Sequence, residues 1–128
     1  MTLLKKLVAA AALSSFSFVA FSAGAADVEV RCEKRSARSK ASVDGSNLRR
    51  GQYRAVLKSG TKAARSAYAP TIGDEAQFDF DSNPNDIAEG ATAIPANFIV
   101  DGRVRGYLVN SENVRVTPIV TAICRIRG

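Results

Sequence analysis

The sequence predicts a small all-β domain: an antiparallel β-sandwich of about seven strands with one short helical turn. Three observations favour this fold class. Apolar and polar residues alternate with a period of two in several short segments, turn residues separate these segments, and no segment after residue 26 keeps the period of an amphipathic helix. A chain of 128 residues that is 46% hydrophobic is large enough for one domain with its own core.

The first segment has the composition of an export signal. Lys5 and Lys6 precede an apolar run over residues 7–21, which ends in small residues. A basic start, a short apolar stretch and an Ala-x-Ala exit are the three parts of a secretory signal peptide. We therefore predict a signal peptide over residues 1–25 and a single β-sandwich domain over residues 26–128. The short apolar run favours bacterial export to the periplasm or the medium, with no transmembrane segment after cleavage.

The first part of the domain contains three predicted strands. Residues 28–32 alternate between apolar and charged side chains, as in a half-buried strand. A second strand is expected around residues 41–43, closed by Asp44-Gly45 as a turn, and a third over residues 53–58 between two glycines. The connection over residues 61–74 is compatible with a short strand or with one helical turn.

A two-faced strand and a helical turn follow. Residues 76–81 alternate between apolar and polar side chains along their whole length. After them, Asn83 suits a helix N-cap, Pro84 the first helical position and Gly90 the residue just past the end, while Asp86 places negative charge near the positive end of the helix dipole. We expect a short connector and not a core helix.

The remaining strands complete the predicted sandwich. Two of them, over residues 96–100 and 103–109, flank Asp101-Gly102, a dipeptide that supplies both positive-φ residues of a type I′ turn. The last strand is expected over residues 114–127, with Pro118 at a bulge or an edge position. This set of strands favours a sandwich that is immunoglobulin-like in its general architecture, with a small barrel as the alternative.

The two cysteines predict a disulfide. Cys32 and Cys124 share the faces of their strands with apolar residues, so both thiols are expected to point inward. In an exported chain, a single pair of cysteines indicates one bridge, here between the first and the last strand. A redox-active pair is the alternative, but a Cys-x-x-Cys spacing is missing from the sequence.

The composition excludes several kinds of chemistry. The sequence contains no His, which excludes Ser-His-Asp and Cys-His catalysis and His-ligated metals. A pair of carboxylates, as in glycan hydrolases, is the catalytic option that remains. Because a domain of this size leaves little room for a substrate cleft beside a core, we expect no enzyme and no cofactor.

Charge is segregated along the chain. Without its signal peptide the chain has 16 Lys+Arg against 12 Asp+Glu, a net charge of +4; residues 27–65 carry a balance of +7 and residues 66–100 a balance of −6. The basic block contains a candidate patch for an anionic surface, formed by Arg35, Arg38, Lys40, Arg49 and Arg50. The alternative is that these side chains are solvated outer positions that protect strand edges from aggregation.

The acidic segment contains a possible weak calcium site. Oxygen-bearing side chains stand at every second position, as in a calcium-binding loop, at Asp79, Asp81, Asn83 and Asn85. The helix-loop-helix calcium pattern nevertheless fails, because Pro84 replaces its obligatory Gly and Gly90 its bidentate Glu. We therefore favour structural roles for these residues and no bound metal.

These observations predict a small, exported, non-catalytic binding or interaction protein. Its expected partner is another protein or an anionic surface polymer, and the scarcity of aromatic residues in the basic block argues against specific nucleic-acid recognition. One alternative is an inhibitor of a secreted or periplasmic hydrolase, which would insert residues 74–89 or the Asp101-Gly102 tip. The second alternative is a carboxylate-based glycan hydrolase.

Overall fold

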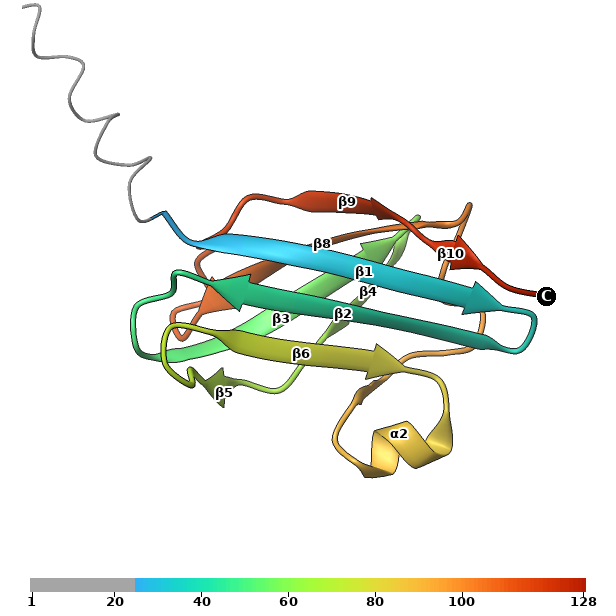
Figure 1. Ribbon diagram of the computed structural model, residues 1–128, viewed down its shortest axis with the longest axis horizontal. Helices are drawn as coiled ribbons and strands as arrows, with labels where there is room; N and C mark the ends of the chain where they lie inside the picture. The colour runs from blue at the N-terminus through green and yellow to red at the C-terminus, as the bar shows by residue number, and fades with distance from the viewer. Residues whose placement is uncertain (1–24) are drawn as a thin grey trace, which may run out of the picture.

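The structure, a computed structural model, describes residues 25–128 and forms two packed β-sheets (Figure 1). The predicted signal peptide lies outside the described residues apart from Ala25. The first sheet has the order β10-β1-β2-β6-β7, with β1 (Asp27–Arg35), β2 (Arg38–Ser46), β6 (Ala76–Asp81), β7 (Thr92–Ala93) and β10 (Arg125–Ile126). The second has the order β4-β3-β8-β9, with β3 (Gln52–Ser59), β4 (Lys62–Arg65), β8 (Arg103–Asn110) and β9 (Val120–Ile123), and β5 (Ala69–Pro70) also pairs with β3. The predicted all-β sandwich is confirmed, and β4 and β5 occupy the connection that the sequence left undecided.

The core lies between the sheets and is built from alternate strand residues. Val43 is fully buried in β2 and stands between Val30 of β1 and Phe78 of β6 in the strand register. Leu57 of β3 and Leu108 of β8 are fully buried from the other sheet. This arrangement follows directly from the period-two pattern, because every second side chain of a strand points to the same face.

Gly45 does not form the predicted turn with Asp44. Both residues lie within β2, where Asp44 pairs with Glu29 and Gly45 with Val28. A Cβ atom at Gly45 would collide with the side chain of Leu108 from the opposite sheet. The glycine is therefore required for close approach of the two sheets and not for a positive φ, which explains why this prediction was wrong.

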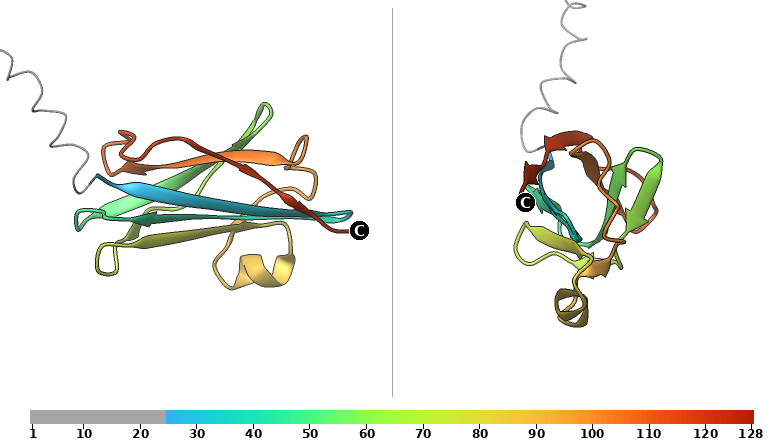
Figure 2. Two further views of the ribbon diagram at one scale, coloured as in Figure 1. Left: turned by 45° about the horizontal axis from the view of Figure 1, so that its top comes forward. Right: turned by 90° about the vertical axis from the view of Figure 1, so that its right-hand side faces the viewer.

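One side of the sandwich is closed by the C-terminal segment. Instead of the single strand predicted over residues 114–127, the chain pairs with β8 through β9, leaves that sheet at Cys124, and pairs with β1 through β10 in parallel (Figures 1 and 2). The Cys32–Cys124 disulfide ties the crossing to β1, as predicted. The two sheets are thus joined along this side by consecutive strands.

A loop and not a strand precedes β8. Of the strand predicted over residues 96–100, only Val100 forms a bridge, to Arg103, although Asp101 and Gly102 have the predicted positive φ values of 56° and 66°. The loop instead buries Phe98 and Ile99 at the end of the sandwich. Burial of this apolar run against the core therefore outweighs pairing of the run as a strand.

Buried hydroxyl groups fix the backbone of the same loop. Ser39 Oγ donates to the Ala96 carbonyl at 2.7 Å, and the Val100 N–H donates to Ser59 Oγ at 2.7 Å. Both serines are almost completely buried. Each therefore supplies a hydrogen-bond partner that the neighbouring strands do not provide.

The predicted helical connector is present as α2 (Pro84–Ala88). The Asn83 side chain accepts a hydrogen bond from the Asn85 N–H at 2.8 Å, and Gly90, with a φ of 116°, follows the C-cap residue Glu89. The helix lies beside the end of β6 and packs outside the core (Figure 1).

Candidate functional site

The outer faces of the two sheets differ in how their charges are compensated. In the described part of the chain, every ion pair within 4.0 Å involves residues of the first sheet or of the segments joined to it. We call the outer face of this sheet the paired face. The outer face of the second sheet has six basic residues and no ion pair, and we call it the cationic face: Arg54, Lys58, Arg65, Arg103, Arg105 and Arg115.

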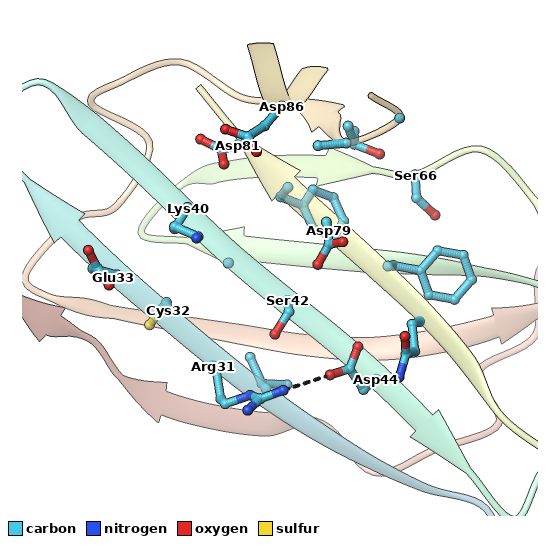
Figure 3. A pocket seen from close by; sticks show the side chains of 18 of the residues that line it. Arg31, Cys32, Glu33, Lys40, Ser42, Asp44, Ser66, Asp79, Asp81 and Asp86 are labelled. Atoms are coloured by element: carbon cyan, nitrogen blue, oxygen red, sulfur yellow. Dashed lines mark hydrogen bonds and ion pairs between the residues drawn. The ribbon is translucent and has the colours of Figure 1, made fainter. Parts of the chain in front are cut away.

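A broad groove of about 950 Å³ runs over the paired face and the edge of β6 (Figure 3). Arg31 of β1 reaches across to Asp44 of β2 at 3.2 Å, the interaction drawn in Figure 3. Glu33 pairs with Arg35 at 2.6 Å and with Arg127 at 3.5 Å. Arg31, Glu33 and Asp44 along the groove are therefore engaged in ion pairs.

Three carboxyl groups along this groove have shifted pKa values: Glu33, Asp44 and Asp81. Burial raises the pKa of Asp44, and this effect is only partly offset by the Arg31 guanidinium. The hydrogen bond from Arg35 lowers the pKa of Glu33. Hydrogen bonding within the sheet thus explains the shift of Glu33, whereas burial explains the shift of Asp44.

Arg38 forms the most buried charge cluster of the paired face. Its guanidinium donates to both carboxylate oxygens of Asp81, at 2.9 and 2.7 Å, and to Asp86 of α2 at 2.8 Å. The Asn83 N–H also donates to Asp81, at 3.0 Å. Burial alone would raise the pKa of Asp81, but these donors bring the pKa below its ordinary value. The cluster fastens β2, β6 and α2 together.

The structure does not bring the five predicted patch residues into one surface. Arg35, Arg38 and Lys40 lie at the hairpin between β1 and β2, where Arg35 and Arg38 are held by carboxylates. Arg49 and Arg50 are exposed in the loop that follows the other end of β2. The nine residues of β2 separate the two groups by roughly 25 Å at the usual rise of a strand.

The four possible calcium ligands also have different surroundings. Asp79 is exposed on the outer face of β6, while both oxygens of Asp81 bind Arg38 and the oxygen of Asn83 caps α2. Within residues 25–128, no three acidic, His or Cys residues are placed to hold a metal ion. Calcium binding at Asp81 would require displacement of the Arg38 guanidinium.

The cationic face is assembled from strands that are distant in sequence. Lys58 of β3 stands directly opposite Arg105 of β8, and Arg65 of β4 stands opposite Val56, which in turn stands opposite Tyr107. As described, the five strands of this sheet contain no acidic residue. The cations therefore have no carboxylate neighbour within their own sheet.

The Lys58–Arg105 pair is the least expected feature of this face. Like charges directly opposite each other on neighbouring strands are destabilising. Protection of strand edges does not explain them, because β3 and β8 are the central strands of their sheet. The Arg105 guanidinium donates to the Gly60 carbonyl at 3.4 Å, and the Lys58 ammonium lies 5.8 Å from the ring centre of Tyr107, so neither cation is neutralised by these contacts.

A shallow depression lies at the centre of the cationic face. Its volume is about 220 Å³, and its floor includes Val56 and Val109, which are only 1% and 4% exposed although they point away from the main core. Long side chains surround these valines, and the aliphatic stems of Lys and Arg can cover apolar surface while their charges stay in water. The surrounding residues include Lys58, Arg65, Arg105, Tyr107, Arg115 and Ile119.

Sequence reasoning missed most of this face. Arg54 and Lys58 belong to the basic block, but Arg103, Arg105 and Arg115 come from the C-terminal third of the chain. The alternation of apolar and polar residues in 103–109 showed which side Arg103 and Arg105 face. It did not show that β8 pairs with β3, and this pairing creates the surface.

Comparisons of this chain with protein-family models, with curated proteins and with solved structures find no match. The fold and the two faces define the chain as a disulfide-linked β-sandwich with one charge-compensated and one uncompensated sheet face.

Proposed function

We propose that this protein is a small, exported, non-catalytic binding domain that holds an anionic partner against its cationic face. The observation that carries the proposal is the Lys58–Arg105 pair on the two central strands. An anionic ligand between these side chains would relieve their repulsion. Such a ligand would also neutralise cations that have no carboxylate partner in the described sheet.

Export is supported by the disulfide and by the composition of residues 1–25. A bridge such as Cys32–Cys124 persists in oxidising compartments outside the cytoplasm. Among residues 25–128, no helix has the length and apolar character needed to cross a membrane. The proposed location is the bacterial periplasm or the medium.

The test compares two variants that each lose two positive charges. Lys58→Ser with Arg105→Ser alters the cationic face, and Arg49→Ser with Arg50→Ser alters the exposed loop after β2. On a matrix coated with a soluble polyanion such as dextran sulfate, we expect the first variant to elute at clearly lower salt than the second. Exposed charges are screened over about 8–10 Å at physiological salt, so retention itself should fall as salt rises.

Thermal unfolding of the same variants supplies the structural control. Removal of the like-charge pair should leave the unfolding midpoint unchanged or raise it, while binding falls. Equal loss of retention in both variants would show attraction by net charge alone and contradict the proposed site. Salt-resistant binding of one secreted hydrolase, unaffected by either variant, would favour the inhibitor function instead.

A further inference from the structure

Exposed aliphatic side chains accompany the cations of the cationic face. Ile119 is 52% exposed and lines the central depression beside Arg105 and Arg115. Ile123 is 76% exposed at the edge strand β9, where it stands opposite Arg103 of β8 and also borders the groove of the paired face. The two isoleucines therefore present apolar surface next to positive charge along the β9 edge of the cationic face and the segment that leads into it.

The aromatic residues near this face are not free to stack on a ligand. The Arg54 guanidinium lies 4.5 Å from the ring centre of Tyr68, and the Lys58 ammonium lies 5.8 Å from that of Tyr107. Single-stranded nucleic acids are usually bound on exposed aromatic rings. The depression, at about 220 Å³, is also smaller than the usual range of roughly 300–1,000 Å³ for small-ligand sites. A broad partner fits this face better than a stacked base or an enclosed ligand.

Cations beside exposed aliphatic side chains match the chemistry of a bilayer surface. Anionic headgroups attract Lys and Arg, and aliphatic side chains enter the boundary between headgroups and acyl chains. We infer that the cationic face docks on a lipid bilayer rich in anionic phosphate headgroups, with Ile119 and Ile123 inserted at the boundary. This inference rests on the proposed function and names its partner.

The experiment measures co-sedimentation of the processed, oxidised protein with vesicles. One set contains equal parts of phosphatidylglycerol and phosphatidylcholine, and the other contains phosphatidylcholine alone. We expect binding to the anionic vesicles only. Lys58→Ser with Arg105→Ser should weaken this binding by about thirtyfold, because each Lys or Arg near an anionic bilayer strengthens binding by about fivefold.

Replacement of isoleucines distinguishes insertion of apolar side chains into the bilayer from electrostatic attraction alone. Ile119→Ser with Ile123→Ser should weaken vesicle binding by about fivefold or more and leave retention on dextran sulfate unchanged, because only the bilayer accepts apolar side chains. Ile72→Ser is the matched control. Ile72 is 85% exposed in the turn between β5 and β6, outside the cationic face, and its replacement should change neither measurement.

The outcomes distinguish this inference from the proposed function. Retention on dextran sulfate that depends on Lys58 and Arg105, with no preference for anionic vesicles or no effect of the isoleucine variants, would overturn bilayer docking and leave the anionic-binding function standing. A wild-type protein that binds neither dextran sulfate nor anionic vesicles would overturn both the proposed function and bilayer docking. Unchanged unfolding midpoints confirm that each variant is folded. If the midpoint of Ile119→Ser with Ile123→Ser falls, the more conservative Ile119→Thr with Ile123→Thr takes its place.

Discussion

At the scale of single residues, Asp81 shows how one carboxylate holds three elements together. Its side chain is 5% exposed and its partner Arg38 is 22% exposed, so the pair is largely shielded from water. Loss of one partner from a buried ion pair leaves the other charge unpaired. The fold therefore depends on Asp81 more than on Asp79, the other acidic residue of β6.

We predict that Asp81→Asn lowers the free energy of unfolding by about 2–3 kcal/mol at neutral pH. Because the pKa of Asp81 is below its ordinary value in the folded state, its contribution is present above the unfolded pKa and is lost as pH falls through the folded pKa. Urea unfolding at pH 7 and at decreasing acidic pH measures both effects. The variant should show a smaller loss of stability with acid, and exposed Asp79→Asn should behave as wild type.

Gly45 illustrates a residue whose role depends on packing between sheets. We predict that Gly45→Ala destabilises the domain by about 1–3 kcal/mol, because the added methyl group forces the buried Leu108 side chain to move. Gly51→Ala is the control, since its Cβ would meet Tyr53 at an ordinary 3.9 Å. Equal midpoints of denaturation for both variants would contradict this prediction, because the two sheets could then move apart at Gly45 without loss of stability.

At the scale of elements, the disulfide links β1 to the segment between β9 and β10. Its cysteines are 92 residues apart, and the chain-entropy model gives about 4–5 kcal/mol of stabilisation for a loop of this size. We predict that Cys32→Ala with Cys124→Ala lowers the unfolding midpoint by roughly 10 °C or more. Calorimetry measures the midpoint. Reduction of the wild-type protein should produce a comparable loss, and no change under either treatment would contradict the prediction.

The junction of β6 and α2 provides a further test at this scale. Because Arg38 binds Asp81 and Asn83 caps the helix, we predict that millimolar calcium changes the unfolding midpoint little. Thermal unfolding with calcium and with a chelator measures the difference. A rise of several degrees that disappears in Asp79→Asn would reverse this expectation and restore a calcium site.

The elements that could be predicted are those with local signals. The alternation in 76–81, the cap at Asn83 and the Asp101-Gly102 turn each depend on neighbours in sequence. The role of Gly45, the loop before β8 and the crossing at Cys124 depend on contacts between distant segments. The cationic face belongs to this second kind, because Lys58 and Arg105 meet only when β3 pairs with β8.

At the scale of the whole molecule, the sandwich is polarised across its thickness. Asp81 and Asp86 of the acidic segment and their partner Arg38 lie with the first sheet, whereas the strands of the second sheet contain basic residues and no acidic ones. A molecule of this kind would present one preferred side to an anionic partner. The net charge of residues 26–128, +4, understates the charge that such a partner would meet.

We predict that the exported protein lacks its first 25 residues, within one or two residues. Removal of Lys5 and Lys6 with this segment would leave the cationic face as the main concentration of uncompensated charge. Intact-mass measurement of material from the periplasm or the medium identifies the new N-terminus. Recovery of a chain that retains Met1 or Lys5 would contradict export with cleavage.

The parallel pairing of β10 with β1 and the disulfide beside it join segments that are far apart in the sequence. Glu33 and Lys34 pair with Arg125 and Ile126, and Cys32 bonds to Cys124, which is 92 residues further along the chain. Neither connection can form before the intervening strands have brought these segments together, and contacts over such long separations form slowly. Closure of this side of the sandwich is therefore expected as a late step of folding.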